Sequence, residues 1–346
     1  MLREVVSLEP RKTVVKEYTE KELGDGQVLI KNHYASCKHG TEMHAFRQDS
    51  PFMEWDNDAA NGFFTKKVNT GSEPYIYHPG NMVVGEIVRM GKDVRGFDVG
   101  QRVAGYGHFR TTAISDADRL LRMDDRMTWQ EAMCFDPAQF ALDGIRDANI
   151  RLGDTAAVFG LGAIGQMTVR LLKQAGAACV FAVDPIAKRR AAALKGGADM
   201  AIDPRAEDAG LRIRLETLKK GADAAIETSG YYDALHAAIR AVGYNCNIAV
   251  VGWYKECTGG LNFGMEAHFN RPSLIFSRAC SQPLREHPMW DWDRNKRACW
   301  EMLSAGMLDC EAVLDPVVSL EQAAIEYMNI DTKPEVSVKL GVDFSL

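Results

Sequence analysis

The sequence predicts an α/β protein with a doubly wound parallel sheet, and three observations support this fold class. Residues 155–183 read as a short apolar strand, a glycine turn, an amphipathic helix and a second apolar strand. The second strand stops at an acid, Asp184. Beyond it, apolar runs keep alternating with helical patterns as far as Ser281. Alternation of this kind is typical of parallel strands joined by crossover helices.

The strands of this region can be placed in order, with helices filling the gaps between them. They are expected at residues 155–159, 178–183, 199–202, 223–228, 246–252 and 273–277. Before this region, apolar runs broken by turns predict short strands, for example at residues 27–32, 82–90 and 101–105. Residues 125–149 and 295–305 read as helical, and 337–342 as a last strand. Residues 48–77 are long, aromatic and rich in turns, which predicts an active-site flap.

The turn after the strand at 155–159 is a G-x-G-x-x-G motif, formed by Gly160, Gly162 and Gly165 around Ala163 and Ile164. The first glycine permits the tight turn, the second lets the backbone approach a pyrophosphate, and the third lets the helix pack on the strand. The helix N-terminus then offers unpaired N–H groups to phosphates. With a strand before it and a helix after it, the motif predicts a dinucleotide site.

Asp184 indicates which dinucleotide binds. It lies 19 residues after Gly165, where a carboxylate can accept the hydroxyls of an adenosine ribose and repels a 2′-phosphate. We therefore expect NAD as the cofactor, with Arg189 beside the adenine. NADP stays an alternative, because Lys188 and Arg190 add positive charge at this end of the site.

Composition excludes several classes of protein. The 346 residues can bury two cores, and 46% hydrophobic with 25% charged residues is ordinary for a globular protein. A net charge of −6 without a basic run argues against nucleic acid or an anionic membrane as partner. No apolar stretch reaches the roughly 18 residues of a membrane span, and residues 1–12 lack the apolar core of a signal peptide. Eight scattered cysteines without a C-x-x-C pair favour reduced thiols in a cytoplasm.

Further motifs, in their order and spacing, resemble the medium-chain dehydrogenase/reductases, the superfamily of zinc alcohol and polyol dehydrogenases, over nearly the whole chain. They are Ala35-Ser36…Gly40-Thr41-Glu42…His44, Gly85-Glu86-Ile87-Val88…Gly91, Val99-Gly100-Gln101-Arg102-Val103, Gly160–Gly165, Asp184 with Arg189-Arg190, Gly196-Gly197-Ala198-Asp199, Glu227-Thr228-Ser229-Gly230 and Lys339-Leu340.

This resemblance implies a GroES-like β-barrel catalytic domain formed by residues 1–143 and 282–346, and a Rossmann domain formed by residues 144–281. The active cleft is then expected between the two. The resemblance also implies cofactor contacts at Ser229, Gly252 and Trp253. Relatives pair through an edge strand, so we expect a homodimer or homotetramer built on residues 273–277.

The zinc ligands of this family are replaced in the sequence. Their positions fall on His39, Asn81, Met82 and Asp136. An Asn amide and a Met thioether are poor zinc ligands, and a catalytic zinc normally has three protein ligands. We therefore expect no bound metal, although Cys37, two residues before His39 in a strand, leaves a rearranged site open. The segment after Arg102 lacks the four clustered cysteines of the family's structural zinc.

Without zinc, another group must handle the hydroxyl proton that accompanies hydride transfer. Our hypothesis is that His39 acts as general acid/base and that Asp136 orients its ring. Thr41 and His44 fall on the positions of the family's proton relay. The alternative is that His39 is a packed residue left after the metal was lost, and His44 an ordinary surface histidine.

Two segments rich in tryptophan and acids, residues 52–58 and 285–294, predict the substrate class. Indole faces flanked by carboxylates and arginines suit a polyhydroxylated ligand. We therefore expect a sugar, polyol or cyclitol. The expected substrate residues are Trp55, Asn81, His108, His287, Trp290 and Trp292. The alternative for Trp290 and Trp292 is packing in a domain or subunit interface.

The leading hypothesis is thus an NAD-dependent alcohol/ketone oxidoreductase of cytoplasmic location. Two rivals remain. A quinone or enoyl reductase of the same superfamily needs no relay and usually takes NADPH, so Asp184, Thr41 and His44 count against it. A non-catalytic protein that binds NAD(H) fits the lost metal ligands, but the retained relay residues and the tryptophans count against it.

Overall fold

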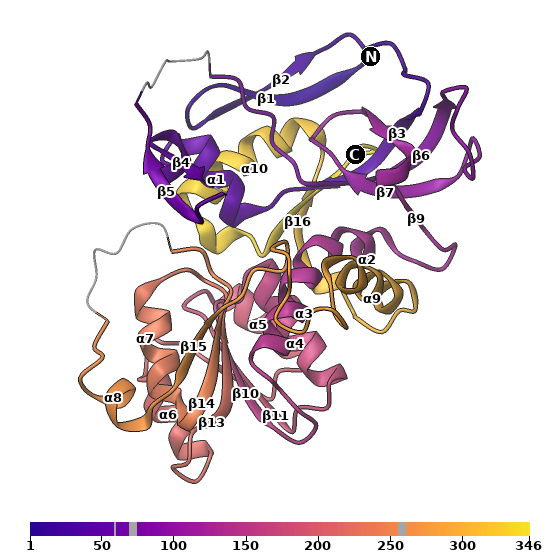
Figure 1. Cartoon of the computed structure of the whole chain (residues 1–346). Helices are drawn as coiled ribbons and strands as arrows, with labels where there is room; N and C mark the ends of the chain where they lie inside the picture. The colour runs from indigo at the N-terminus through magenta and orange to yellow at the C-terminus, as the bar shows by residue number, and fades with distance from the viewer. Residues whose placement is uncertain (59, 69–74, 255–260) are drawn as a thin grey trace. The chain divides into compact units, whose positions relative to one another are not determined.

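The computed structural model describes residues 1–346 apart from 59, 69–74 and 255–260, and it divides into two compact units (Figure 1). Unit 1 comprises Met1–Met123 and Pro316–Leu346, and unit 2 comprises Asp124–Asp315. The predicted domain boundaries, 143/144 and 281/282, differ from these. The residues between the two sets of boundaries include the helices α2 (Trp129–Met133) and α9 (Trp292–Ser304) and most of α3 (Phe135–Asp147). Within unit 2, α3 packs against α9, against the helix α4 (Ala163–Gln174) and against the strand β14 (Val242–Val250). No helix among the described residues has the length and apolar character needed to cross a membrane.

Unit 2 is built on a six-stranded sheet in the order β12-β11-β10-β13-β14-β15. Every neighbouring pair is parallel. The strands are β10 (Thr155–Phe159), β11 (Cys179–Val183), β12 (Met200–Ile202), β13 (Ala222–Glu227), β14 (Val242–Val250) and β15 (Ser273–Phe276). Each overlaps a strand expected from the sequence, so the doubly wound sheet is confirmed.

Helices flank this sheet, as Figure 1 shows. They are α2 (Trp129–Met133), α3 (Phe135–Asp147), α4 (Ala163–Gln174), α5 (Ala187–Lys195), α6 (Ala209–Glu216), α7 (Tyr232–Ala241), α8 (Glu266–Asn270) and α9 (Trp292–Ser304). The apolar faces of β10, β13 and α7 meet in one core cluster, which includes Phe159, Leu235 and Ile239. Burial of these side chains fixes the strand ends that carry the glycine motif.

Unit 1 is mostly antiparallel β-structure. Its main sheet has the order β16-β17-β3-β6-β7-β9, and β8 also pairs with β3. The strands and helices are β1 (Arg3–Glu9), β2 (Lys12–Glu17), β3 (Gln27–Ser36), α1 (His39–Arg47), β6 (Met82–Met90), β7 (Arg102–Tyr106), β8 (Thr112–Asp116), β9 (Leu121–Arg122), β16 (Leu314–Val318), α10 (Leu320–Thr332) and β17 (Lys339–Asp343). β16 crosses the unit boundary. The GroES-like β-domain implied by the resemblance is therefore present.

The predicted flap contains a short 3-10 turn (Pro51–Met53) and a small hairpin of β4 (Trp55–Asp58) and β5 (Phe63–Lys66). Residues 59 and 69–74 of the flap lie outside the described residues. The hairpin's aromatic side chains are about half exposed, and those of Phe52 and Phe64 contact each other.

Strand register collects the polar loops of unit 1 at one edge of its sheet. Ser36, at the end of β3, pairs with Met82 at the start of β6. Met82 in turn pairs with Tyr106 at the end of β7, and Gly341 of β17 pairs with Ser36. The loops that carry His39 and His108 therefore emerge at the same edge.

Candidate active site

The glycine motif forms the turn between β10 and α4. Gly160 has φ of +83°, a region that a residue with a Cβ rarely adopts. A Cβ on Gly165 would overlap the carbonyl oxygen of Gly160, whereas a Cβ on Gly162 would meet no atom within 4 Å. The turn, the open backbone at the start of α4 and the close helix–strand contact are thus the three features the motif requires.

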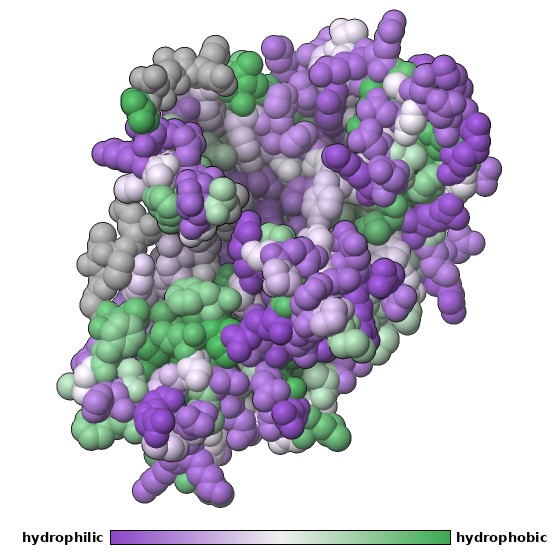
Figure 2. Space-filling model, in the orientation of Figure 1, coloured by the Kyte–Doolittle hydropathy of each residue, from purple (hydrophilic) through white to green (hydrophobic). Residues whose placement is uncertain are grey.

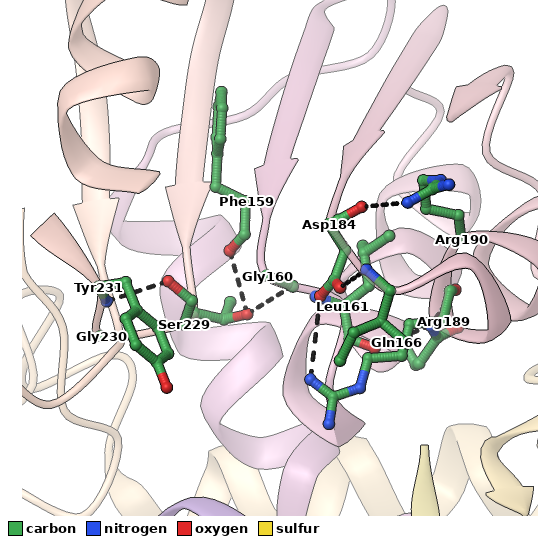
Figure 3. A network of polar contacts seen from close by, with 12 residues as sticks. Phe159, Gly160, Leu161, Gln166, Asp184, Arg189, Arg190, Ser229, Gly230 and Tyr231 are labelled. Atoms are coloured by element: carbon green, nitrogen blue, oxygen red, sulfur yellow. Dashed lines mark hydrogen bonds and ion pairs between the residues drawn. The ribbon is translucent and has the colours of Figure 1, made fainter. Parts of the chain in front are cut away.

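The start of α4 has an open backbone, and a buried amide of the same helix connects it to α5. Gly162 caps the helix and no side chain does so, which leaves its first N–H groups for a ligand. The side-chain amide of Gln166 donates to the carbonyl oxygens of Leu161 and Arg189, at 3.0 and 2.8 Å (Figure 3). This fully buried amide fixes α5 against the glycine turn.

Asp184 lies directly after β11 and is almost completely buried. Its Oδ2 accepts the backbone N–H of Leu161 at 2.7 Å, and its Oδ1 accepts that of Ile186 at 2.7 Å (Figure 3). A carboxylate oxygen has two acceptor sites, so each oxygen can accept more than one hydrogen bond. The Arg189 guanidinium lies 4.0 Å from Oδ2. Burial lowers the pKa of Arg189 below its usual value, and the nearby charge of Asp184 opposes this shift.

Sequence reasoning gave no role to Glu227, the last residue of β13. Its side chain is fully buried and accepts hydrogen bonds from the residues that follow the strand and from Tyr254. Burial raises the pKa of this carboxyl group. A glutamate ending an otherwise apolar strand, Ala222–Glu227, was the signal available in the sequence.

In unit 1, His39 is the first residue of α1, and its ring is held by the last strand. The backbone N–H of Leu340 donates to its Nε2 at 3.1 Å. We therefore assign the ring proton of the neutral imidazole to Nδ1. The neighbouring Cys37 is buried, and burial together with the charge of Glu42 raises the pKa of its thiol. Its carbonyl oxygen accepts from the buried ammonium group of Lys339 at 2.7 Å.

Glu42 is a second buried carboxylate that the sequence did not assign. Its Oε2 accepts from the hydroxyls of Tyr77 and Tyr327, at 3.2 and 3.0 Å, and from the backbone N–H of Gly80 at 3.0 Å. Its Oε1 accepts from the backbone N–H of Lys38. One side chain thus fixes the start of α1 against the loop that carries Asn81.

The remaining predicted residues of unit 1 lie nearby or on α1. Thr41 is exposed, and the Nδ1 of His44 pairs with Asp49. The backbone carbonyl of Asn81 accepts from Gly107 at 3.0 Å, which brings Asn81 beside the His108 loop. The Oδ1 atom of Asn81 is buried and has no hydrogen-bond partner among the described residues. Trp55 lies apart, in the β4–β5 hairpin.

The remaining predicted residues of unit 2 lie in several places. Ser229, Gly252 and Trp253 follow β13 and β14, at the edge of the sheet that carries the glycine motif. Asp136 is buried in the first turn of α3.

The two indoles pack inside unit 2. The guanidinium groups of Arg146 and Arg294 both lie over the Trp290 ring, 3.6 and 4.4 Å from its centroid. The Trp292 ring packs edge-on against Phe140, and His287 is exposed. Both tryptophans therefore pack against residues of unit 2, and neither their contact with substrate nor their packing in a domain or subunit interface is tested by these contacts.

The donor set does not fit a zinc ion. The Nε2 lone pair of His39 is engaged by Leu340, and Met82 is a fully buried residue of β6. The remaining ligand of unit 1 would be the amide of Asn81, which is a poor zinc ligand. Among the described residues, no three His, Cys, Asp or Glu side chains are grouped so that they could hold a metal ion.

Comparisons with known proteins agree with this geometry. Residues 24–134 match the family model described as alcohol dehydrogenase GroES-like domain, and residues 163–292 match that described as zinc-binding dehydrogenase. The chain is 42% identical over 350 residues to the D-guloside 3-dehydrogenase of Escherichia coli (strain K12), covering 99% of this chain and 100% of the relative.

Two solved structures share the fold at low sequence identity. A zinc-binding dehydrogenase from Sinorhizobium meliloti 1021 bound to NADP has a TM-score of 0.77 at 17% identity. An alcohol dehydrogenase from E. coli CFT073 complexed with NADH has a TM-score of 0.75 at 18% identity. Each alignment covers 99% of both chains.

The third and second glycines of the motif predict different effects of one added methyl group. Gly165→Ala forces the methyl group into the Gly160 carbonyl and should lower the free energy of unfolding by about 3 kcal/mol. Gly162→Ala meets open space and should leave the melting temperature nearly unchanged. Thermal unfolding of both variants followed by circular dichroism measures the difference. Equal melting temperatures would contradict the close packing of α4 on β10.

Proposed function

We infer the function from one premise: this chain belongs to the zinc-dependent medium-chain dehydrogenase/reductase superfamily, and it is an oxidoreductase. We propose that it transfers hydride between NAD and a secondary hydroxyl of a sugar or glycoside, at the position equivalent to C3 of a D-guloside. The observation that carries this proposal is the 42% identity, over its full length, to a D-guloside 3-dehydrogenase.

The cofactor part of the proposal rests on unit 2. The open backbone at Gly162 and the N-terminus of α4 would hold the pyrophosphate. The remaining acceptor sites of Asp184 would take the ribose hydroxyls, and its charge would repel a 2′-phosphate. Arg189 and Arg190 weaken this discrimination, so NAD over NADP is a preference and not an exclusion. Bound NAD supplies the carbon that accepts hydride from the substrate.

The acid–base part of the proposal rests on His39. With Nε2 accepting from Leu340, the Nδ1–H of the neutral ring can hydrogen-bond to a substrate oxygen and polarise a ketone. To transfer a proton, the ring has to alternate between the imidazolium and the neutral form protonated on Nε2. It therefore has to release Leu340 in either direction of the reaction. We propose that this exchange, with Asp136 stabilising the charged ring and Thr41 and His44 passing the proton on, replaces zinc.

The substrate part of the proposal is supported by both polar and aromatic residues. The buried, unpartnered Oδ1 of Asn81 is an acceptor that a sugar hydroxyl would satisfy. Trp55 exposes 41% of its surface and offers a flat face for the C–H side of a sugar ring. His108 lies beside the Asn81 loop, where it can bind a further hydroxyl. Contacts from His287, Trp290 and Trp292 are the least supported part, because both indoles already pack within unit 2.

We also propose a homodimer or homotetramer in a reducing cytoplasm. β15 is the edge strand of its sheet, and apolar side chains gather around it on the side of α7 and α8 (Figure 2). Phe269 and Phe276 expose about three quarters of their surfaces there, at 73% and 75%. A second β15 would cover both the edge and these rings. The described cysteines are all unpaired thiols, which suits a reducing compartment.

The activity test follows NADH absorbance after the protein is mixed with NAD and D-gulosides, other glycosides, polyols and cyclitols. We expect turnover with glycosides and at least about tenfold lower kcat/KM with NADP, because the carboxylate opposes the added phosphate. Asp184→Asn should reduce that ratio. Turnover with quinones or enoyl compounds alone, or with no substrate, would contradict the proposal.

The proton-transfer test replaces His39 by Asn. We expect kcat to fall by about 100-fold or more, the usual size of a lost general acid/base, while KM for NAD stays unchanged. His33→Asn, a histidine in β3 of the same unit, is the matched control and should keep full activity. Dialysis against a chelator should leave the wild-type rate unchanged. Activity that depends on added zinc, or unaltered turnover of the His39→Asn variant, would contradict the assignment.

The assembly test introduces a charge at the exposed edge. Phe276→Glu should reduce the mass measured by light scattering after size exclusion, because each copy would place a carboxylate against the apolar edge of the other. Leu211→Glu, an exposed leucine of α6, is the control and should keep the wild-type mass. A monomeric wild-type protein would contradict this interface.

A further inference from the structure

The carboxylate of Glu227 is a buried anion surrounded by donors. Its Oε1 accepts from the backbone N–H of Ser229 at 2.6 Å and from the hydroxyl of the same residue. The N–H of Gly230 lies 3.2 Å from each carboxylate oxygen. The hydroxyl of Tyr254 donates to Oε2. Every one of these partners is a donor, so the geometry is matched to the ionised form.

The backbone of Glu227 joins a second segment to the first. Its carbonyl oxygen accepts from the N–H of Val251 at 2.8 Å and from that of Gly252 at 3.0 Å. The ring of Tyr254 packs on that of Tyr232, with centroids 4.9 Å apart. One residue therefore fixes both the turn that begins α7 and the segment that follows β14.

These two segments end in exposed side chains on the side of the glycine turn. Ser229 lies directly against Gly160, since a Cβ on that glycine would come within 2.7 Å of the Ser229 side chain. Trp253 exposes 43% of its surface and Tyr231 exposes 74%. Figure 3 shows Ser229 and Tyr231 on one side of Gly160 and Asp184 on the other.

Strand order assigns the two sides to different halves of a dinucleotide. β11, which carries Asp184, and β13, which carries Glu227, are the two neighbours of β10. A dinucleotide whose pyrophosphate lies on the turn after β10 has its halves over opposite neighbours. If the adenosine ribose lies on the β11 side, the nicotinamide lies on the side of β13 and β14.

We propose that Glu227 and Tyr254 are positioning residues for the nicotinamide half of the cofactor. Their hydrogen bond holds Ser229 and Trp253 in the relative position that the nicotinamide riboside requires. Neither residue needs to touch the cofactor. This inference rests on the proposed function, because it assumes that a pyridine dinucleotide binds unit 2.

The test uses Tyr254→Phe, which removes one hydroxyl and leaves the ring on Tyr232. We expect the Kd for NADH, measured by isothermal titration calorimetry, to rise about tenfold, as for the loss of one hydrogen bond to a charged group. The Kd for ADP, which lacks the nicotinamide riboside, should stay within about twofold of wild type. Glu227→Gln should act in the same direction with a larger loss, because its amide places donors against donors. Tyr244→Phe, an exposed tyrosine of β14, is the matched control for both ligands.

The outcomes separate this inference from the function on which it rests. A wild-type protein that binds ADP but not NADH would refute the proposed function. Wild-type binding of NADH with unchanged affinity in Tyr254→Phe would overturn the positioning role. A parallel loss for NADH and ADP would also overturn it, because the pair would then support only the general fold of unit 2. If Glu227→Gln does not fold, Tyr254→Phe still decides.

Discussion

The contact between Gly160 and Gly165 is the constraint on which the nucleotide site depends. Because a methyl group on Gly165 would overlap the Gly160 carbonyl, only a chain with glycine there can bring the start of α4 so close to the end of β10. That distance sets where the helix N-terminus points. Gln166, in α4, then donates a hydrogen bond to the carbonyl oxygen of Leu161, and Asp184, after β11, accepts one from the N–H of the same residue. Backbone shape, and not side-chain chemistry, therefore defines the anion-binding surface.

Each unit contains a buried glutamate whose carboxylate is surrounded by hydrogen-bond donors, Glu42 in unit 1 and Glu227 in unit 2. An uncompensated buried carboxylate is strongly destabilising. Glu42 and Glu227 each accept backbone N–H groups of a neighbouring loop and a tyrosine hydroxyl. Both carboxylates thereby join loops near the predicted site to other segments of the same unit. These loops are held by hydrogen bonds to a carboxylate and not by apolar contact alone.

The sequence predicted the strands of unit 2 because they are short, apolar and bounded by glycine or acid. It placed the start of β14 late: the strand begins at Val242, but the exposed Tyr244 and Asn245 interrupt its apolar pattern before the buried residues at its end. The domain boundaries differ because α3 packs on both α4 and α9, a tertiary contact that sequence periodicity does not predict. The glycine turn and Asp184 could be proposed from the sequence because the residues they contact are close in the chain. Glu42 was missed because Tyr327, one of its partners, comes from the far end of the chain.

The role of the C-terminal strand illustrates the same limit. The resemblance included Lys339-Leu340 only as a motif, yet in the structure the Leu340 N–H occupies the Nε2 of His39 and the Lys339 ammonium group binds the carbonyl of Cys37. An imidazole that accepts a backbone hydrogen bond has only its other nitrogen for proton exchange. At the position that the resemblance assigns to a metal ligand, the imidazole thus accepts from a backbone donor, and a zinc ion would have to compete with the Leu340 N–H for the same lone pair.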